Sequence, residues 1–385
     1  MDVNAPRGIL RFFGNMEDPR EAQGRRHELL DIVVIAICAV ICGASGWNDV
    51  ALFGCGHEPW LATFLRLPHG IPAHDTFGRV FARLAPEVFE RRFLAWVQHL
   101  AQVSAGRLIA VDGKTIRRSF DTAAEKAALH MVSAWCESNQ TVLGQVVTAA
   151  KSNEITAIPQ LLELLDLEGA VVTTDALGCQ KAIAEKIIAG GADYILQVKG
   201  NQPHLEKELE KLFDECRRQD PHAVAHDYVE AVDKGHGRIE TRRCWMTTDV
   251  NWLPGKDAWQ NLSSFACVEA VRQIGAQVQT DRRYFISSVE KRDAARMLAR
   301  VRGHWGIENR LHWCLDVTFG EDQRRVRTGY AAENFSRLSR IALNLLKTGP
   351  APFAHARSVR ARRLLAAWDH DYLLSILTHE PQAGT

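Results

Sequence analysis

Between residues 108 and 198, short apolar runs alternate with longer segments of helical periodicity. Three β-like runs separated by polar stretches come first, and helices and strands then follow one another singly. We expect strands at 108–111, 130–135, 142–148, 170–174 and 194–198, and helices at 155–167 and 180–189. Because parallel strands must be joined by long crossovers, usually helices, this order predicts an α/β fold in which helices flank a mixed sheet.

The segments on either side of this region have different patterns. Residues 1–104 are predicted to be helical, with an amphipathic helix soon after Pro72. Alternating segments within about 221–290, interrupted by a Pro-Gly turn at 254–255, predict a β-rich insertion. The chain of 385 residues is therefore expected to contain a helical N-terminal domain and an α/β domain, 105–385, that carries the insertion.

The composition restricts the function class and the compartment. The formal net charge is only +1, so a nucleic-acid partner would have to be held by local basic patches. The nine cysteines are scattered and form no CxxC pair, which indicates reduced thiols and a cytoplasmic location rather than disulfides or zinc. The longest apolar run, 32–44, is too short to span a bilayer, so no membrane partner is expected.

Acidic residues follow two of the expected strands. Asp112 closes the apolar run that begins at Leu108, and Asp175 closes the run at 171–174. Because ligand sites of α/β sheets form at the carboxyl ends of strands, two parallel neighbours would bring Asp112 and Asp175 together. Two unpaired carboxylates repel each other and raise a pKa, and a bound divalent cation removes that repulsion. The pattern therefore predicts a metal site.

A third acid, Glu308, lies within RVRGHWGIENRLHWCLDV, residues 300–317. If this segment is a continuous helix, Glu308 shares an inward-facing stripe with Trp305 and His312. Burying an unpaired carboxylate is costly, so a cation shared with the two aspartates would explain its position. Three oxygen ligands suit Mg²⁺ or Mn²⁺, and two such ions about 4 Å apart can activate an attacking oxygen and stabilise a leaving one.

Each acid also has a structural interpretation when taken alone. An aspartate at a strand end often caps a loop, and Glu308 can form a surface ion pair with Arg310. AVDGKT suggests another enzyme class, the aspartyl phosphatases, but the nucleophile of their DxDGT motif falls here on Ala110. The order strand Asp, strand Asp, helix Glu, with crossovers between, is instead the arrangement of ribonuclease-H-like polynucleotidyl transferases.

Over nearly its whole length the chain resembles the DDE transposases of bacterial insertion sequences, in the subfamily that includes the H-repeat-associated proteins. The motifs that carry the resemblance are RRHELLDIVVIAICAVICGASGW, IPAHDTFGRVF, IAVDGKTIR, KSNEITAIPQLL, TTDALGCQ, DYILQVKGNQP, HWGIENRLHWCLDVTFGED and NFSRLSRIALNLLK. The resemblance implies an RNase-H-like catalytic core in 105–385 and binding of DNA ends by 1–104.

The resemblance also implies chemistry and partners. Asp112, Asp175 and Glu308 would be the catalytic, metal-binding triad for two Mg²⁺ (or Mn²⁺) ions. The implied activity is DNA cleavage with strand transfer at the ends of a mobile element. The implied partners are double-stranded DNA with terminal inverted repeats, target DNA, and a second copy of the chain in a DNA-bound homodimer.

The chain departs from related transposases that carry a Tyr-Arg-Glu-Lys signature. The Tyr, Arg and Lys of that signature fall here on Val301, His304 and Leu315, so their phosphate-holding roles do not transfer directly. The arginine-rich stretch 324–363 is the clearest basic patch of the chain. We expect DNA contacts from Lys114, Arg117, Lys199, Asn201, Arg302, His304 and Arg310.

Two alternatives remain open at this point. Glu321 or Asp322 of the FGED motif can complete the triad instead of Glu308, although the helix-face argument favours Glu308. A catalytically inactive DNA-binding relic that keeps the same fold is the alternative to an active enzyme. The presence of all three acids counts against simple decay, but activity does not follow from their presence.

Overall fold

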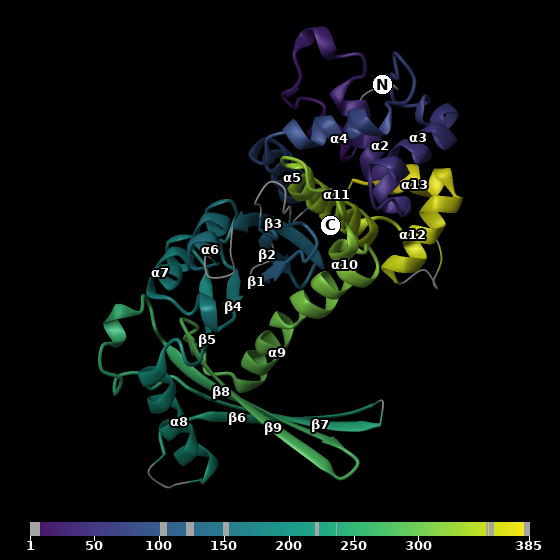
Figure 1. Ribbon diagram of the computed structural model, residues 1–385. Helices are drawn as coiled ribbons and strands as arrows, with labels where there is room; N and C mark the ends of the chain where they lie inside the picture. Colours follow the sequence, from purple (N-terminus) through teal and green to yellow (C-terminus); the bar gives the residue numbers. More distant parts are fainter. Residues whose placement is uncertain are drawn as a thin grey trace.

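The computed structural model describes residues 8–100, 106–120, 127–148, 154–219, 223–235, 237–351, 353 and 358–380. Within them one mixed sheet has the strand order β3-β2-β1-β4-β5-β9-β8-β7-β6 (Figure 1). The strands are β1 (Leu108–Thr115), β2 (His130–Cys136), β3 (Thr141–Thr148), β4 (Val171–Thr174), β5 (Asp193–Val198), β6 (Asp227–Gly235), β7 (Arg238–Thr247), β8 (Ser264–Ile274) and β9 (Gln277–Ser287).

Helices lie on both faces of the sheet and form a separate group beside β3 (Figure 1). They are α1 (Leu10–Phe13), α2 (Leu29–Cys42), α3 (Trp47–Leu61), α4 (His74–Arg83), α5 (Pro86–Leu100), α6 (Glu154–Glu163), α7 (Lys181–Ala189), α8 (Pro203–Arg217), α9 (Ala294–His304), α10 (Trp313–Val317), α11 (Ala331–Thr348), α12 (Val359–Trp368) and α13 (His370–Leu377).

The first five strands have the expected topology. β1, β2 and β3 form an antiparallel meander, and β4 and β5 join the other side of β1 as parallel strands. The connections into β4 and β5 run through α6 and α7, as crossovers between parallel strands require. The predicted RNase-H-like mixed sheet flanked by helices is confirmed.

The predicted β-rich insertion is also confirmed, and it extends the central sheet. β6 to β9 form an antiparallel meander, and β9 pairs with β5, with Ile195 opposite Ser287. α9 then packs back against β1 and β7, burying Met297 and Leu298. The insertion therefore leads the chain back across the sheet toward the two aspartates.

The N-terminal helices pack with helices from the far end of the chain, as Figure 1 shows for α2, α11 and α12. α2 is almost entirely buried, which explains why its sequence is apolar on every side. The Trp47 ring stacks on Phe81 and contacts Phe335 of α11, with ring centroids 4.8 and 4.9 Å away. The helical N-terminal region is thus confirmed, while the expected boundary at 104–105 lies outside the described residues.

The helical group also closes one edge of the sheet. The side chain of Asn344 on α11 accepts a hydrogen bond from the Val142 N–H and donates one to its carbonyl, both at 2.8 Å. Glu90 on α5 accepts from the Gln145 N–H of the same strand. These bonds satisfy backbone groups of the edge strand β3 and fix the helices relative to the sheet.

No single helix in the described part of the chain is long and apolar enough to cross a membrane, and α2 and α3 reach that length only as a pair bent by 98°. The nine cysteines all carry free thiols.

Candidate active site

The strand register places Asp112 beside Asp175. β1 and β4 are parallel neighbours, and their last paired residues are Val111 and Thr174. The next residue on each strand is one of the two aspartates, so both carboxylates lie at the carboxyl end of β4. Asp175 leaves the sheet there and caps a short 3₁₀ turn, where its Oδ1 accepts the N–H groups of Leu177 and Gly178 at 3.0 and 3.3 Å.

β1 itself does not end at Asp112, contrary to the expectation from the sequence. It continues to Thr115, because the antiparallel partner β2 pairs with it along this whole length. Gly113 is required within the strand, since a Cβ there would collide with the side chains of Glu154 and His130. His130 Nε2 lies 2.5 Å from Glu154 Oε1, and both side chains are buried.

The electrostatics of Asp112 differ from those of an ordinary surface aspartate. Burial, followed by the neighbouring charge of Asp175, raises the pKa of Asp112 to about 7, and Glu308 and Glu154 contribute in the same direction. Only 18 % of the Asp112 side chain is exposed. Burial and repulsion from neighbouring carboxylates therefore both oppose the ionisation of Asp112.

Glu308 lies close enough to influence Asp112, but not in the way the helical pattern predicts. The segment 300–317 is not one continuous α-helix, because a π-helical turn, Ile307–His312, separates α9 from α10. A π-turn accommodates more residues than an α-turn and so rotates the side chains after it. Ile307 and Leu311 consequently face the core, and Glu308 is exposed.

The end of α9 and this π-turn lie directly against β1. Gly303 packs on Leu108, and any Cβ at Gly303 would collide with that leucine side chain. The π-turn itself contacts β1. π-Helical turns are rare in proteins and often occur at functional sites. Here the turn places the Glu308 carboxylate at the surface near Asp112.

The alternative third acid, Glu321, is engaged elsewhere. It is 1 % exposed and accepts from Lys114 Nζ at 3.0 Å, Arg340 Nη1 at 2.8 Å and Ser336 Oγ at 2.7 Å. Burial opposes ionisation, but Arg340 and Lys114 outweigh it and hold the pKa of Glu321 far below its ordinary value. This carboxylate is an internal counter-ion, which favours Glu308 as the third acid of the site.

Lys114, expected to contact DNA, belongs to the same internal network. It is 9 % exposed and lies 2.5 Å from Asp316, 3.0 Å from Glu321 and 3.3 Å from Asp322. Three carboxylates enclose the ammonium group, so its geometry is that of a structural cation. Because residues two apart on a strand point to the same face, Lys114 lies on the face of β1 that carries Asp112.

His304, also expected to contact DNA, is turned toward the sheet. Its Nδ1 lies 2.9 Å from the Thr173 hydroxyl, and burial together with Arg283 lowers its pKa to about 4. A neutral, partly buried imidazole bonded to β4 is suited to positioning the end of α9 rather than to holding a phosphate.

The remaining expected DNA contacts lie at the surface. Lys199 is exposed after β5, and Arg117 is 83 % exposed, with its backbone N–H bonded to Asp322. Arg302 and Arg310 are about half exposed and form ion pairs with Asp233 and Glu137, at 3.1 and 2.7 Å. Their contact with DNA remains a prediction.

Asn201 supports the loop after β4 from the neighbouring strand. Its side-chain amide donates to the carbonyl of Ala176, the residue that follows Asp175, at 2.5 Å. This contact holds the start of the 3₁₀ turn, Ala176–Gly178, that Asp175 caps. A positioning role for Asn201 is therefore visible, and contact with DNA remains a prediction.

Sequence reasoning put His312 on the stripe of Glu308 without assigning it to the site, and it missed the His130–Glu154 pair. His312 Nδ1 lies 3.5 Å from Asp112 Oδ2, and burial, with Arg340 and Lys114, lowers its pKa to about 3. The imidazole therefore stays neutral beside the aspartate. Neither arrangement has a local signal, because each brings together residues far apart in the chain.

The donor chemistry of the three acids fits a divalent cation. Asp112, Asp175 and Glu308 offer the hard carboxylate oxygens that Mg²⁺ and Mn²⁺ prefer, and a cation would relieve the repulsion that raises the pKa of Asp112. Among the described residues, no group of three or more His, Cys, Asp or Glu side chains is already arranged as a complete ligand set.

Comparison with known proteins adds independent information. The model of the DDE_Tnp_1-associated family matches residues 10–97, and that of the transposase DDE domain matches residues 104–345. The "H repeat-associated putative transposase YhhI" of Escherichia coli K12 is 39% identical over 375 residues, which cover 96% of this chain and 97% of that protein.

Two further relatives have contrasting descriptions. The "Putative transposase YncI" of Escherichia coli O157:H7 is 40% identical over 347 residues, which cover 88% of this chain and 87% of that protein. The "Inactive transposase YbfQ" of Escherichia coli K12 is 44% identical over 66 residues, which cover 17% of this chain and 79% of that protein.

Proposed function

The chain belongs to the transposase DDE-domain family, and from this premise we propose that it is an active, metal-dependent insertion-sequence transposase. It cleaves double-stranded DNA at the terminal inverted repeats of its element and joins the freed ends to target DNA. The observation that carries the proposal is the register of β1 and β4, which sets Asp112 beside Asp175 with the charge of Glu308 nearby.

Asp112, Asp175 and Glu308 would hold two Mg²⁺ or Mn²⁺ ions. Bound there, the metal supplies activation of the attacking oxygen and stabilisation of the leaving oxygen during in-line displacement at a phosphodiester. Two of the acids come from neighbouring strands of the sheet, and the third comes from the π-turn that contacts β1. Such preorganisation removes most of the entropic cost of assembling the site around DNA.

Other residues of the chain position these acids. The Lys114–Glu321–Arg340 network fixes β1, and Asn201 fixes the loop that begins at Asp175. The neutral His312 can exchange a hydrogen bond with Asp112 without adding charge. We propose that the exposed cations Arg117, Lys199, Arg302 and Arg310 contact the phosphates of the bound DNA and that two chains pair two DNA ends.

A nicking assay tests the proposal. The substrate is a supercoiled plasmid that carries the gene with its genomic flanking sequence, incubated with the full-length protein and Mg²⁺, Mn²⁺ or EDTA. We expect metal-dependent nicking by the native protein. We expect a loss of at least about 100-fold in Asp112→Asn and Glu308→Gln, because each removes a ligand worth several kcal/mol of transition-state stabilisation.

Glu185→Gln is the matched control, because Glu185 is an exposed acid on α7, away from the site. It should nick like the native protein. Equal nicking by native protein and Asp112→Asn would contradict the proposal. Absence of nicking by the native protein on this plasmid would favour the catalytically inactive DNA-binding alternative.

A further inference from the structure

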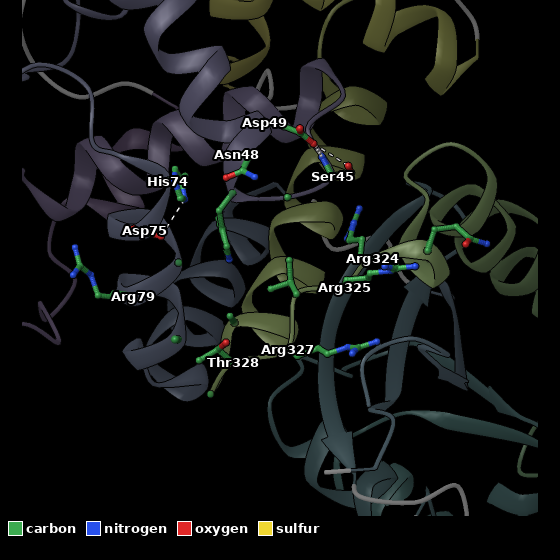
Figure 2. A pocket seen from close by; sticks show the side chains of 18 of the residues that line it. Ser45, Asn48, Asp49, His74, Asp75, Arg79, Arg324, Arg325, Arg327 and Thr328 are labelled. Carbon is green, nitrogen blue, oxygen red and sulfur yellow. Dashed lines mark hydrogen bonds and ion pairs between the residues drawn. The ribbon is translucent and has the colours of Figure 1, made fainter. Parts of the chain in front are cut away.

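A large cleft lies between the N-terminal helices and the segment that precedes α11. Its volume is about 1080 Å³. Figure 2 shows its two sides, with Asn48, His74 and Arg79 on the helical side and Arg325 and Arg327 on the facing segment. The helical side is built from the start of α3 and from α4, and the facing side from residues 320–331.

The cleft carries positive charge that the protein itself does not neutralise. Arg79, Arg83 and Arg325 line it and are exposed. Within the described part of the chain, none of the three forms an ion pair or a side-chain hydrogen bond. Because the whole chain has a net charge of only +1, three free guanidinium groups in one cleft are a strong local excess.

The acids of the cleft have other partners. Asp49 accepts hydrogen bonds from the backbone N–H and the hydroxyl of Ser45, at 2.8 and 2.9 Å. Asp75 lies 3.1 Å from the imidazole of His74. In the described residues neither carboxylate forms an ion pair with Arg79, Arg83 or Arg325. Five arginines line the cleft and only two aspartates do, so the positive charge is in excess.

A second arginine-lined groove, between α9 and the β-rich insertion, differs in this respect. Arg242 pairs there with Asp233, Arg283 pairs with Asp281, and Arg302 pairs with Asp233. Among the described residues, four of the five arginines that line that groove form an ion pair with a carboxylate, and Arg272 does not. The first cleft therefore has more arginines without an ion pair, three compared with one.

The cleft is physically connected to the strand that carries Asp112. Arg327 donates from Nε to the carbonyl of Arg118 at 3.2 Å, and its guanidinium lies over the Phe120 ring. Since Arg118 follows Asp112 by six residues, the separation of their Cα atoms is at most about 20 Å. At about 3.4 Å per base pair, this separation corresponds to about six base pairs of duplex between Asp112 and the Arg118 side of the cleft.

We propose that this cleft binds the phosphate backbone of the DNA duplex that is cleaved at Asp112, within one helical turn of the cleavage point. The inference rests on the proposed function, and it assigns DNA contact to two segments acting together, α4 and residues 320–331. Guanidinium groups from both sides would hold phosphates, which fixes the register of the duplex without reading its bases.

Fluorescence anisotropy tests the inference in EDTA, where no cleavage occurs. The probe is a labelled duplex of about 30 base pairs from the end of the flanking repeat, titrated between about 0.05 and 0.2 M salt. The variant Arg79→Ala/Arg83→Ala/Arg325→Ala removes the free charges. The control Arg66→Ala/Lys207→Ala/Lys211→Ala removes the same charge from exposed residues outside the cleft.

The logarithm of the association constant falls as log salt rises, and each phosphate contact contributes about 0.9 to the steepness of this slope. The slope of the triple cleft variant should therefore be shallower by about 2.7, and the variant should bind at least about 30-fold more weakly at 0.1 M salt. The control should keep the native slope. Urea unfolding of each variant shows whether it is folded. If the triple variant is unstable, the single variant Arg325→Gln replaces it, and its slope should be shallower by about 0.9.

The two proposals fail separately. A cleft variant that binds with the affinity and slope of the control overturns the cleft assignment, and so does a native protein that does not bind the duplex. Neither result changes metal-dependent nicking of the plasmid. Conversely, the anisotropy measurement in EDTA needs no cleavage, so a failed nicking assay leaves the cleft measurement interpretable.

Discussion

Replacing Asp112 by asparagine should stabilise the metal-free protein at alkaline pH, although it removes a residue of the proposed active site. The native pKa of Asp112 is about 7, compared with an ordinary value of 3.8. The folded state therefore favours the protonated carboxyl more than the unfolded state does. The contribution of the protonated Asp112 carboxyl to the free energy of unfolding is fully present below about pH 4 and is lost progressively as the pH rises to about 7.

The structure sets the size of this effect. At about 1.4 kcal/mol for each pKa unit, ionisation of Asp112 lowers the free energy of unfolding by up to about 4 kcal/mol at pH 8. The side chain is 18 % exposed, so little of this is screened by solvent. Asparagine is neutral at every pH, and its stability advantage over the native protein should grow by about 3 kcal/mol between about pH 5 and pH 8.

Urea unfolding followed by circular dichroism in EDTA measures this difference. Asp257→Asn, at an exposed position, is the control and should show no pH-dependent advantage. Added Mg²⁺ should stabilise the native protein at pH 8 and leave Asp112→Asn unchanged, because ligand stabilises only a chain that binds it. An advantage that does not grow with pH would refute the electrostatic argument.

Three other substitutions separate structural from catalytic roles. Lys114→Met should lower the free energy of unfolding by about 3–5 kcal/mol in urea titrations, because it leaves Glu321 buried with one cation fewer; a change under about 1 kcal/mol would contradict the network. Gly113→Ala should cost at least about 1–3 kcal/mol in the same assay through its collision with Glu154, and native-like stability would disprove the close packing. Glu308→Gln should change stability by less than about 0.5 kcal/mol because the side chain is exposed, while nicking is lost; a large loss of stability would indicate a structural role instead.

Much of the fold follows from local sequence patterns. The expected strands 108–111, 130–135 and 142–148 correspond to β1, β2 and β3, and the alternation that follows corresponds to α6, β4, α7 and β5. Hydrophobic periodicity depends on residues two to four positions apart, so it survives in the sequence whatever the rest of the chain does. The position of Asp112 and of Asp175 directly after an apolar run is a pattern of this kind, whereas the pairing of β1 with β4 brings the two together.

Local patterns failed where long-range packing chose the geometry. β1 runs past Asp112 because β2 pairs with it, and Glu308 turns outward because a π-turn interrupts the helix expected across 300–317. The spacing of apolar residues does not reveal a π-turn, because one added residue in a single turn changes that spacing very little.

The sequence by itself determined most of the elements and their order along the chain, because these depend on neighbouring residues. Only the tertiary structure decided which charges face inward. In the arginine-rich stretch 324–363, Arg337 and Arg340 are buried as counter-ions, while Arg325 is left free in the cleft. A charge is neutralised by whichever group lies within a few ångströms, and that group is set by the fold and not by distance along the chain.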